Sequence, residues 1–189
     1  MDLIIKPFEK TDIESTKILT DKEIGQDYFS LEELREMQQR SQFESRTASF
    51  VLRSDQEVFG IRLSFPPGQW QKGKGAGLSE NLWDHKKSET AYFQSLFISN
   101  KVQKQGWGKR LSEKSLKVLK EMGAKAVVCH SWVESPGEAS KKYLLSLGFK
   151  GLALYPEYWK GVDYICPRCS KPCLCTAEEM YLDLAGSKS

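Results

Sequence analysis

One short segment in the middle of the chain has the residue types and the spacing for holding phosphate. It consists of Gln103, Lys104, Gln105, Gly106, Trp107 and Gly108, and it lies between an apolar run at 91–98 and an amphipathic segment at 109–122. A strand, a glycine-containing turn and a helix start, in this order, leave unpaired backbone N–H groups at the positive end of the helix dipole. Glycine also lets the main chain approach a ligand closely. The segment therefore predicts a cradle for a phosphate-bearing ligand at Gly106.

Other glycine-rich phosphate loops do not fit this segment. The P-loop requires G-x-x-x-x-G-K-[ST], and the dinucleotide fingerprint requires a third glycine that is missing here. The residues from Gln103 to Gly108 do match the pattern Q/R-x-x-G-x-G/A. In this they resemble the pyrophosphate loop of the GCN5-related N-acetyltransferase (GNAT) family, which binds acetyl-coenzyme A.

The residues after this loop extend the resemblance. Residues 126–133 read as a short buried strand, and residues 136–147 read as a helix capped by the preceding serine. The helix ends in Leu147-Gly148-Phe149, where the glycine can take the left-handed conformation. GNAT proteins typically end this helix in the same L-G-F signature. The resemblance covers Tyr92 to Phe149 and, more loosely, the whole chain.

The resemblance implies an α/β (α+β) fold, the acetyl-CoA acyltransferase fold, with a central mixed sheet of about seven strands and helices on both faces. The length of 189 residues suits a single domain, 1–189. Sequence patterns predict the remaining strands at 3–7, 48–53, 58–65, 152–155 and 179–182, and helices from Thr11 or Asp12 to about Leu19 and from a capping box of Ser30 and Glu33 to about Arg40.

Residues 66–88 interrupt this order of elements with a stretch rich in glycine and proline. A connection of this length without regular structure is unusual in a compact domain and is often a lid or a binding loop. A mobile, solvated insertion is the alternative. Because no strand or apolar helix brackets its glycines, we do not expect a second phosphate site there.

The resemblance also implies which residues meet the coenzyme. In the family, the strand before the phosphate loop splays from its neighbour and offers main-chain hydrogen bonds to pantetheine. By register from Gln103, these positions fall at Leu96, Phe97 and Ile98. The residues expected to bind the coenzyme are therefore Leu96, Phe97, Ile98, Gln103, Lys104, Gln105, Gly106, Trp107, Gly108 and Lys109.

The acid and the base of an acetyl transfer are less directly indicated. Many relatives place a glutamate on the strand before the phosphate loop, and here that strand has no carboxylate. The tyrosine common three residues before L-G-F is replaced by Leu144, and Tyr143 lies one residue early. We expect Tyr143 as general acid, His130 to take the amine proton and Glu134, on the same face of a strand by period-two spacing, to bind the amine. The alternative is that His130 is a core residue and Glu134 a surface charge.

Four of the five cysteines lie within ten residues near the C-terminus, at Cys166, Cys169, Cys173 and Cys175. The C-x₂-C spacing of the first pair is typical of zinc sites, and such density in a chain without secretory features favours zinc over disulfides. Four thiolates would leave zinc no open position, so a metal at residues 166–175 is expected to be structural and to precede the last strand. Free thiols or a disulfide are the alternatives.

Composition and charge limit the compartments and the classes of partner that can be expected for this protein. Hydrophobic residues make up 40% of the chain, charged residues 28%, and the net charge is +3. This charge is too small to indicate nucleic-acid binding by itself. The N-terminus does not have the pattern of a signal peptide, and no apolar run reaches the length of a membrane span. We therefore expect a cytoplasmic protein with reduced cysteines and no membrane partner.

These observations favour one function over two alternatives. We expect an acetyl-CoA-dependent N-acetyltransferase that moves the acetyl group to a primary amine by direct attack in a ternary complex, with a structural zinc ion. The acceptor can be a small-molecule or a peptide amine, and the protein can be a monomer or a homodimer. The alternatives are a zinc-bearing binding module that contacts nucleic acid or protein, and a non-catalytic acyl-CoA-binding protein.

Overall fold

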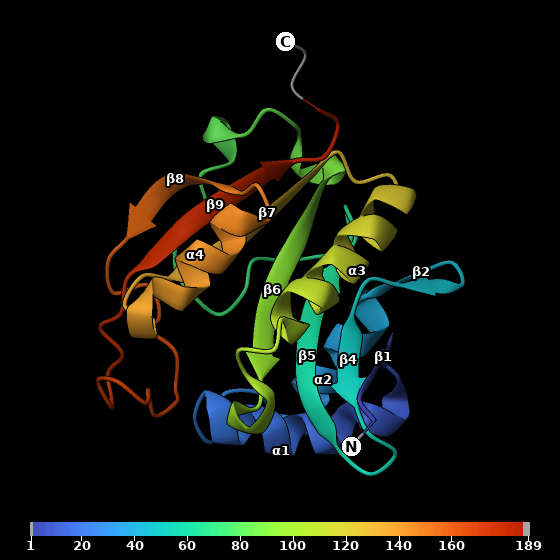
Figure 1. The fold of residues 1–189 in the computed structure, drawn as a ribbon. Helices are drawn as coiled ribbons and strands as arrows, with labels where there is room; N and C mark the ends of the chain where they lie inside the picture. The colour runs from blue at the N-terminus through green and yellow to red at the C-terminus, as the bar shows by residue number, and fades with distance from the viewer. Residues whose placement is uncertain (1, 187–189) are drawn as a thin grey trace.

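A twisted seven-stranded sheet forms the centre of the computed structural model, which describes residues 2–186 (Figure 1). The strand order is β1-β4-β5-β6-β7-β9-β8, and among these neighbours only β6 and β7 are parallel. The strands are β1 (Ile4–Pro7), β4 (Phe50–Arg53), β5 (Val58–Phe65), β6 (Thr90–Ile98), β7 (Ala126–Trp132), β8 (Lys150–Tyr155) and β9 (Ala177–Asp183), and a separate hairpin joins β2 (Gln42–Phe43) to β3 (Arg46–Thr47). The mixed sheet of seven strands is as expected; the small hairpin was not predicted.

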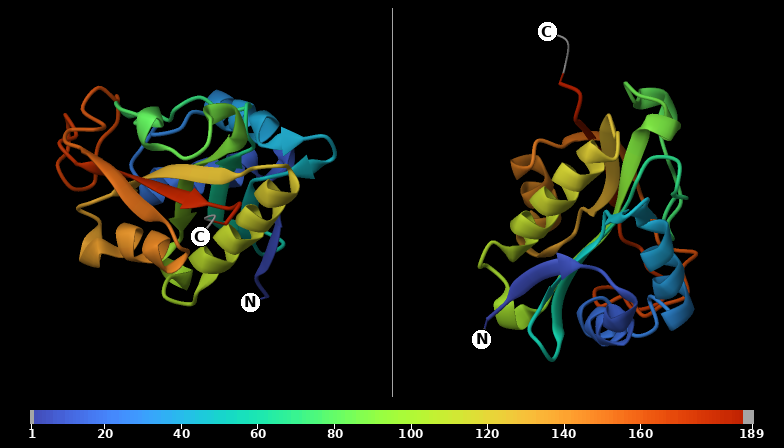
Figure 2. Two further views of the ribbon diagram at one scale, coloured as in Figure 1. Left: turned by 90° about the horizontal axis from the view of Figure 1, so that it is seen from above. Right: turned by 90° about the vertical axis from the view of Figure 1, so that its right-hand side faces the viewer.

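Helices cover both faces of this sheet, as predicted (Figure 2). One face carries α1 (Ile13–Glu23), α2 (Leu31–Arg40) and the insertion at 66–88; the other carries α3 (Trp107–Glu121) and α4 (Ala139–Ser146). Short 3₁₀ turns lie at Lys10–Asp12, Glu80–Leu82, Lys87–Glu89, Asn100–Val102 and Pro136–Glu138. Within residues 2–186 there is no helix with the length and apolar content needed to cross a membrane.

Local sequence explains where the two best-defined helices begin and which face they bury. At the start of α2, Ser30 Oγ accepts the Glu33 N–H at 3.1 Å and the Glu33 carboxylate accepts the Ser30 N–H at 2.8 Å, which is the predicted capping box. Helix α3 buries Leu111, Ser115 and Leu119, spaced four residues apart, so that one stripe faces the sheet and the lysines remain outside.

The prediction of one helix over 136–147 is wrong at its start. Residues 136–138 form a 3₁₀ turn, and α4 begins only at Ala139. The backbone is left-handed at Gly137 (φ +63°) and Glu138 (φ +56°), which an α-helix cannot contain. The Ser135 hydroxyl therefore accepts the Ser140 N–H, at 3.1 Å, instead of capping a helix at Pro136. The helix at the N-terminus also extends further than predicted, to Glu23.

The parallel strands β6 and β7 separate halfway along their length. Their pairing begins at Thr90↔Ala126 and ends at Phe93↔Cys129. At that point Gln94 forms a bulge, because β5 pairs through Ser64↔Phe93 and then through Leu63↔Ser95. Beyond the bulge the two strands diverge toward the end where α3 begins (Figure 1). The splayed strand expected from the family resemblance is thus present.

The insertion at 66–88 packs against the sheet and is not a solvated loop. Trp70 is only 6% exposed, and its ring stacks on Tyr92 at 4.8 Å between centroids. The Trp70 indole donates to the Thr90 carbonyl at 2.7 Å. Further along, the Ala76 N–H donates to the Tyr158 carbonyl at 2.9 Å. The insertion is therefore a fixed layer over β6 and the segment after β8.

Candidate active site

A cavity of about 930 Å³ opens where β6 and β7 separate. One end is lined by the phosphate loop at Gln103–Lys109 and the other by the cysteine segment at Cys166 and Cys175. Between them the wall is formed by β6, β7 and α4. Of the residues expected to bind coenzyme, those that line the cavity are Leu96, Phe97, Ile98, Gln103, Lys104, Gly106, Trp107, Gly108 and Lys109, which leaves out Gln105.

The phosphate loop has the geometry of an anion cradle. Gly106 is the N-cap of α3 and has a left-handed backbone (φ +80°), and a Cβ there would meet nothing within 4 Å. The first N–H groups of α3 therefore point to open space at the positive end of the helix dipole. Gly108 brings the helix close to β6, since a Cβ there would lie 3.1 Å from Leu96 Cδ2. The Gln103 side chain secures the loop by donating to the Ile98 carbonyl at 2.9 Å.

Tyr143 lies in the cavity on the side of the sheet covered by α3 and α4. Its hydroxyl accepts from the Arg62 Nη2 at 2.7 Å and makes a short hydrogen bond with Ser112 Oγ. Burial raises the pKa of Tyr143, although Arg62 and Ser112 oppose this effect. The phenol therefore holds its proton at neutral pH. The one-residue offset from the family position does not keep Tyr143 out of the cavity, because α4 starts late and after two left-handed residues.

His130 lies in the cavity on the opposite side of the sheet. Its Nδ1 is 3.2 Å from the Tyr92 hydroxyl, and its ring stacks on Tyr158 at 4.6 Å between centroids. The His130 side chain is only 3% exposed. Tyr92 and Tyr158 also line the cavity, so the imidazole contacts the cavity together with two phenols.

The expected pairing of His130 with Glu134 is not found. Strand β7 ends at Trp132, so period-two spacing no longer applies at Glu134. The Glu134 carboxylate instead accepts the Thr176 N–H at 2.9 and 3.0 Å, and it does not line the cavity. The carboxylate beside the imidazole belongs to Glu179 on β9, with Oε2 3.6 Å from His130 Nε2.

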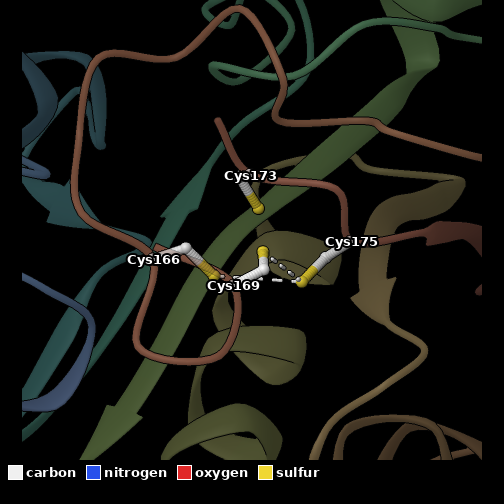
Figure 3. Close-up of side chains that lie close together, drawn as sticks. All are labelled: Cys166, Cys169, Cys173 and Cys175. Carbon is white, nitrogen blue, oxygen red and sulfur yellow. Dashed lines mark hydrogen bonds between the residues drawn. The ribbon is translucent and has the colours of Figure 1, made fainter. Parts of the chain in front are cut away.

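The four cysteines of the C-terminal segment converge on one point (Figure 3). Their Sγ atoms all lie within 4.8 Å of one another. Cys175 Sγ is 3.9 Å from that of Cys166 and 3.8 Å from that of Cys169, which is too long for a disulfide of about 2.05 Å. Four sulfurs at about 2.3 Å from zinc would be about 3.8 Å apart at the corners of a tetrahedron. The donor set and its spacing therefore fit a tetrahedral zinc ion.

Hydrogen-bond donors are directed at these sulfurs. The Leu174 N–H donates to Cys169 Sγ and the Tyr164 hydroxyl donates to Cys173 Sγ, both at 3.2 Å. Burial raises the pKa of Cys166, but the backbone N–H groups of Cys169 and Arg168 and the thiols of Cys169 and Cys173 together lower it to about 7, whereas burial raises the pKa of Cys173 and of Cys175. N–H and O–H donors directed at sulfur are the environment of a metal ligand.

Arg62 and Glu179 are site residues that the sequence reasoning missed. Arg62 is 3% exposed and lies in β5, where every other side chain is apolar or small. Its guanidinium is 4.3 Å from the centre of the Phe93 ring. A single charge inside an apolar strand was a usable signal, because buried charges are retained where they have a partner. Glu179 had no such signal, since it stood at the start of the strand predicted at 179–182, where charged residues are common.

Comparison with known proteins agrees with this geometry. A sequence model described as the acetyltransferase (GNAT) family matches residues 18–149. None of the curated proteins matches the sequence. Three solved structures share the fold. The Escherichia coli ribosomal-protein-S18-alanine N-acetyltransferase is 15% identical (TM-score 0.66), and the alignment covers 100% of this chain and 99% of that one. Arabidopsis thaliana NAA60 in complex with acetyl-CoA is 11% identical (TM-score 0.70; 98% and 100%). The putative acetyltransferase yncA from Salmonella typhimurium with acetyl-CoA is 15% identical (TM-score 0.68; 100% and 98%).

Because the family match spans more than half of the chain and the splayed strands and the loop at Gln103–Gly108 have the family's form, the chain belongs to the GNAT acetyltransferase family.

Proposed function

We propose that this protein transfers the acetyl group of acetyl-CoA to a primary amine by direct attack within a ternary complex. The main support for the proposal is the cavity between the diverging strands β6 and β7. This cavity extends from the phosphate loop at Gln103–Lys109 to His130 and Tyr158. A thioester placed in the gap between β6 and β7 is accessible from both faces of the sheet. The coenzyme would enter from the α3 side and the amine from the side of α1, α2 and the insertion.

The two faces supply different chemistry. On the α3 side, the protonated Tyr143 phenol can give its proton to the leaving thiolate, and the buried Arg62 guanidinium stabilises the negative charge that develops there. On the other side, His130 can take the proton that the amine loses. The backbone of Leu96, Phe97 and Ile98, whose edge beyond Phe93 has left β7, offers hydrogen bonds to pantetheine.

Cys129 does not provide a covalent route. It lies in the wall of the cavity, but burial raises the pKa of its thiol to about 12. The thiolate is the nucleophilic form, so at neutral pH Cys129 stays protonated. This supports direct transfer to the amine without an acetyl-enzyme intermediate.

The acceptor is proposed as an amine of a peptide or of a small molecule. One relative of similar fold acts, by its name, on an alanine of a ribosomal protein. In this chain the acceptor end of the cavity is rich in aromatic side chains, with Trp132, Tyr158, Trp159 and Tyr164 among its lining residues. Aromatic faces attract alkylammonium groups and pack against apolar side chains, which suits either class of amine.

We also propose that Cys166, Cys169, Cys173 and Cys175 hold a structural zinc ion. The metal would fix the segment between β8 and β9, and this segment forms one end of the cavity through Cys166 and Cys175. Four thiolates leave no open coordination position, so the zinc would not take part in the transfer. Zinc thiolates persist in a reducing compartment, which is consistent with the cytoplasm.

Calorimetric titration with acetyl-CoA tests the coenzyme site. The Gly106→Asp variant places a carboxylate at the N-terminus of α3 and should abolish binding. Gly123→Asp is the matched control, because Gly123 follows the other end of α3, has a similar backbone (φ +88°) and has equally open space for a Cβ. Both variants add the same charge and similar backbone strain, so a loss of binding confined to Gly106→Asp would be due to its position at the cradle.

Micromolar binding by the wild type and by Gly123→Asp, with none by Gly106→Asp, would support the coenzyme site. Radiolabelled acetyl transfer to a panel of amines and peptides would then test turnover. Folded wild-type protein that does not bind acetyl-CoA would refute the enzyme proposal and favour a binding module. Binding without transfer to any amine would favour a non-catalytic acyl-CoA-binding protein.

A further inference from the structure

The carboxylate of Glu179 is fully buried in the middle of β9, where a charge is costly unless it is compensated. Its Oε1 accepts the Trp83 indole N–H at 2.8 Å. Its Oε2 accepts the Ser79 N–H at 2.8 Å and the Tyr155 hydroxyl at 3.3 Å, and it lies 3.6 Å from His130 Nε2. Both oxygens are therefore surrounded by donors.

This environment consists of donors, and an ionised carboxylate accepts at both oxygens without adding a donor of its own. Burial alone would raise the pKa of Glu179. The nearby His130 imidazole and the hydrogen bonds from the Trp83 indole and the Ser79 N–H instead hold it below its ordinary value. Glu179 is thus a fixed buried anion beside the imidazole.

The anion determines which nitrogen of His130 carries the proton. Nε2 is buried and has no hydrogen-bond partner among residues 2–186, and Glu179 Oε2 at 3.6 Å is an anionic acceptor in the direction of that nitrogen. A proton on Nε2 is therefore favoured. Nδ1 then carries a lone pair, which accepts a hydrogen bond from the Tyr92 hydroxyl at 3.2 Å. The Tyr92 oxygen in turn accepts the Gly73 N–H at 3.3 Å, so its own proton is free to point at Nδ1.

The insertion holds every member of this arrangement. In addition to Gly73, Ser79 and Trp83, it packs two glycines directly on tyrosine rings. A Cβ at Gly75 would lie 1.7 Å from Tyr158 Cε1, and a Cβ at Gly77 would lie 2.3 Å from Tyr155 Cδ1. Gly75 and Gly77 thus make room for Tyr158 and Tyr155, while a Cβ at Gly73 would lie 2.7 Å from Gln94 Nε2 and 3.0 Å from the Tyr92 hydroxyl.

We propose that Glu179 is a positioning residue for His130, and that the insertion at 66–88 exists to hold Glu179 and the tyrosines in place. The inference rests on the proposed acetyl transfer. It assigns His130 Nδ1 as the final acceptor of the amine proton and Tyr92 as the group that passes the proton to it.

In the proposed transfer every proton has a donor and an acceptor. The amine nitrogen attacks the thioester carbon, and the carbon–sulfur bond breaks. The proton lost by the nitrogen goes to the Tyr92 oxygen as the Tyr92 hydroxyl proton moves to His130 Nδ1, while the thiolate takes the proton of Tyr143. The resulting imidazolium is stabilised by Glu179, and solvent afterwards returns one proton from His130 to Tyr143. Burial raises the pKa of Tyr92, so the phenol conducts the proton and does not persist as a phenolate.

The groups that face His130 come from several elements. Tyr92 on β6 meets Nδ1, Glu179 on β9 meets Nε2, and Tyr158 stacks on the ring. Tyr155 on β8 lies 6.0 Å from the ring centre and donates to Glu179. Within residues 2–186, Glu179 is the only one of these groups that carries a charge at neutral pH.

Glu179→Gln is the decisive variant because it keeps the shape and replaces one acceptor by a donor. The amide must then face the Trp83 indole N–H at one position, or the Ser79 N–H and His130 Nε2 at the other. Glu178→Gln is the matched control on the same strand, since Glu178 pairs with Lys141 and does not line the cavity. The chain has two histidines, and His85→Gln assigns their NMR signals.

Long-range ¹H–¹⁵N NMR of the imidazoles shows which nitrogen of His130 carries the proton, and the measurement needs no acceptor amine. We expect the Nε2–H form of His130 in the wild type and in Glu178→Gln, and loss of this single form in Glu179→Gln. Acetyl-CoA affinity should stay within about threefold of the wild type, while kcat/KM for the best amine of the panel falls by about 10²-fold or more, the range of a displaced general base. Tyr92→Phe should lower kcat/KM similarly and leave the tautomer on Nε2.

The outcomes separate this inference from the proposed function. If the wild type binds acetyl-CoA and acetylates an amine, but Glu179→Gln keeps both the tautomer and the rate, the positioning role is wrong and the acetyltransferase stands. If the tautomer changes and the rate does not, His130 is not the proton acceptor. If the wild type does not acetylate any amine, the proposed function fails first and the proton transfer through Tyr92 fails with it.

Discussion

Replacing Gly75 with alanine tests whether the insertion is a fixed layer over the active site. The new Cβ would lie 1.7 Å from Tyr158 Cε1 and 2.0 Å from Cδ1. Carbon atoms in contact are normally about 3.5–4.0 Å apart, so the ring or the insertion must move by about 2 Å. Tyr158 is 3% exposed and stacks on His130, so a movement of its ring would disturb this stacking.

The expected cost is that of overpacking a core, about 1–3 kcal/mol. For a chain of this length each kcal/mol lowers the Tm by about 2–4 °C, so we expect a decrease of roughly 2–12 °C. The displaced Tyr158 ring would also disturb His130. Turnover should therefore fall while acetyl-CoA affinity is kept, because the phosphate loop lies at the far end of the cavity.

A double-mutant cycle isolates the clash from other effects. In a Tyr158→Leu background the ring is gone, and Gly75→Ala should then cost less than about 0.5 kcal/mol, which gives a coupling energy of about 0.5–3 kcal/mol in urea unfolding. Gly68→Ala is the control within the same insertion, since a Cβ at Gly68 meets nothing within 4 Å. Its cost comes from its left-handed backbone alone and should not depend on Tyr158. Zero coupling between Gly75 and Tyr158 would refute the fixed-layer account.

Three further predictions concern the acid, the metal and the buried anion. Tyr143→Phe should lower kcat by about 10²-fold with acetyl-CoA affinity nearly unchanged, and an unaltered kcat would remove Tyr143 from the mechanism. Cys166→Ser combined with Cys169→Ser should lower the zinc content, measured by mass spectrometry from about one ion per chain, and the Tm together; an unchanged Tm would contradict a structural metal. The pKa of Glu179 is depressed in the folded state, so its ionisation contributes stability above its ordinary value of 4.5, and this contribution is lost as the pH falls through the folded value. The difference in unfolding free energy between the wild type and Glu179→Gln should accordingly shrink below about pH 4.5 in urea titrations, and a constant difference from pH 7 to pH 3 would show that Glu179 is not held as an anion.

Features built from neighbouring residues could be predicted from the sequence. The phosphate loop needs only a strand, two glycines and a helix start in succession, and all of these lie between 91 and 122. The capping box at Ser30 and Glu33 and the cluster of four cysteines are local in the same sense, because ten residues or fewer bring their atoms together. Backbone geometry over a short span is set mainly by the residue types within it.

The partners of the proposed proton transfers could not be predicted in this way. His130 and Glu179 are far apart in sequence and meet because β7 and β9 pair in a register that places them directly opposite. Arg62 on β5 and Tyr143 on α4 are also far apart in sequence and are brought together only by the tertiary fold. The prediction that Glu134 lies on the same strand face as His130 was wrong, because β7 ends at Trp132 and the alternation of strand faces does not extend to Glu134.

The sequence by itself therefore determined the family, the glycine-containing turn at Gln103–Gly108 and the cysteine cluster, each of which depends on short-range geometry. The tertiary structure alone decided which charged groups are buried together at the splay. The reason is physical: a side chain's pKa and proton position depend on the donors and charges around it, and around His130 these come from β6, β8, β9 and the insertion. Nothing in the local sequence of β7 specifies them.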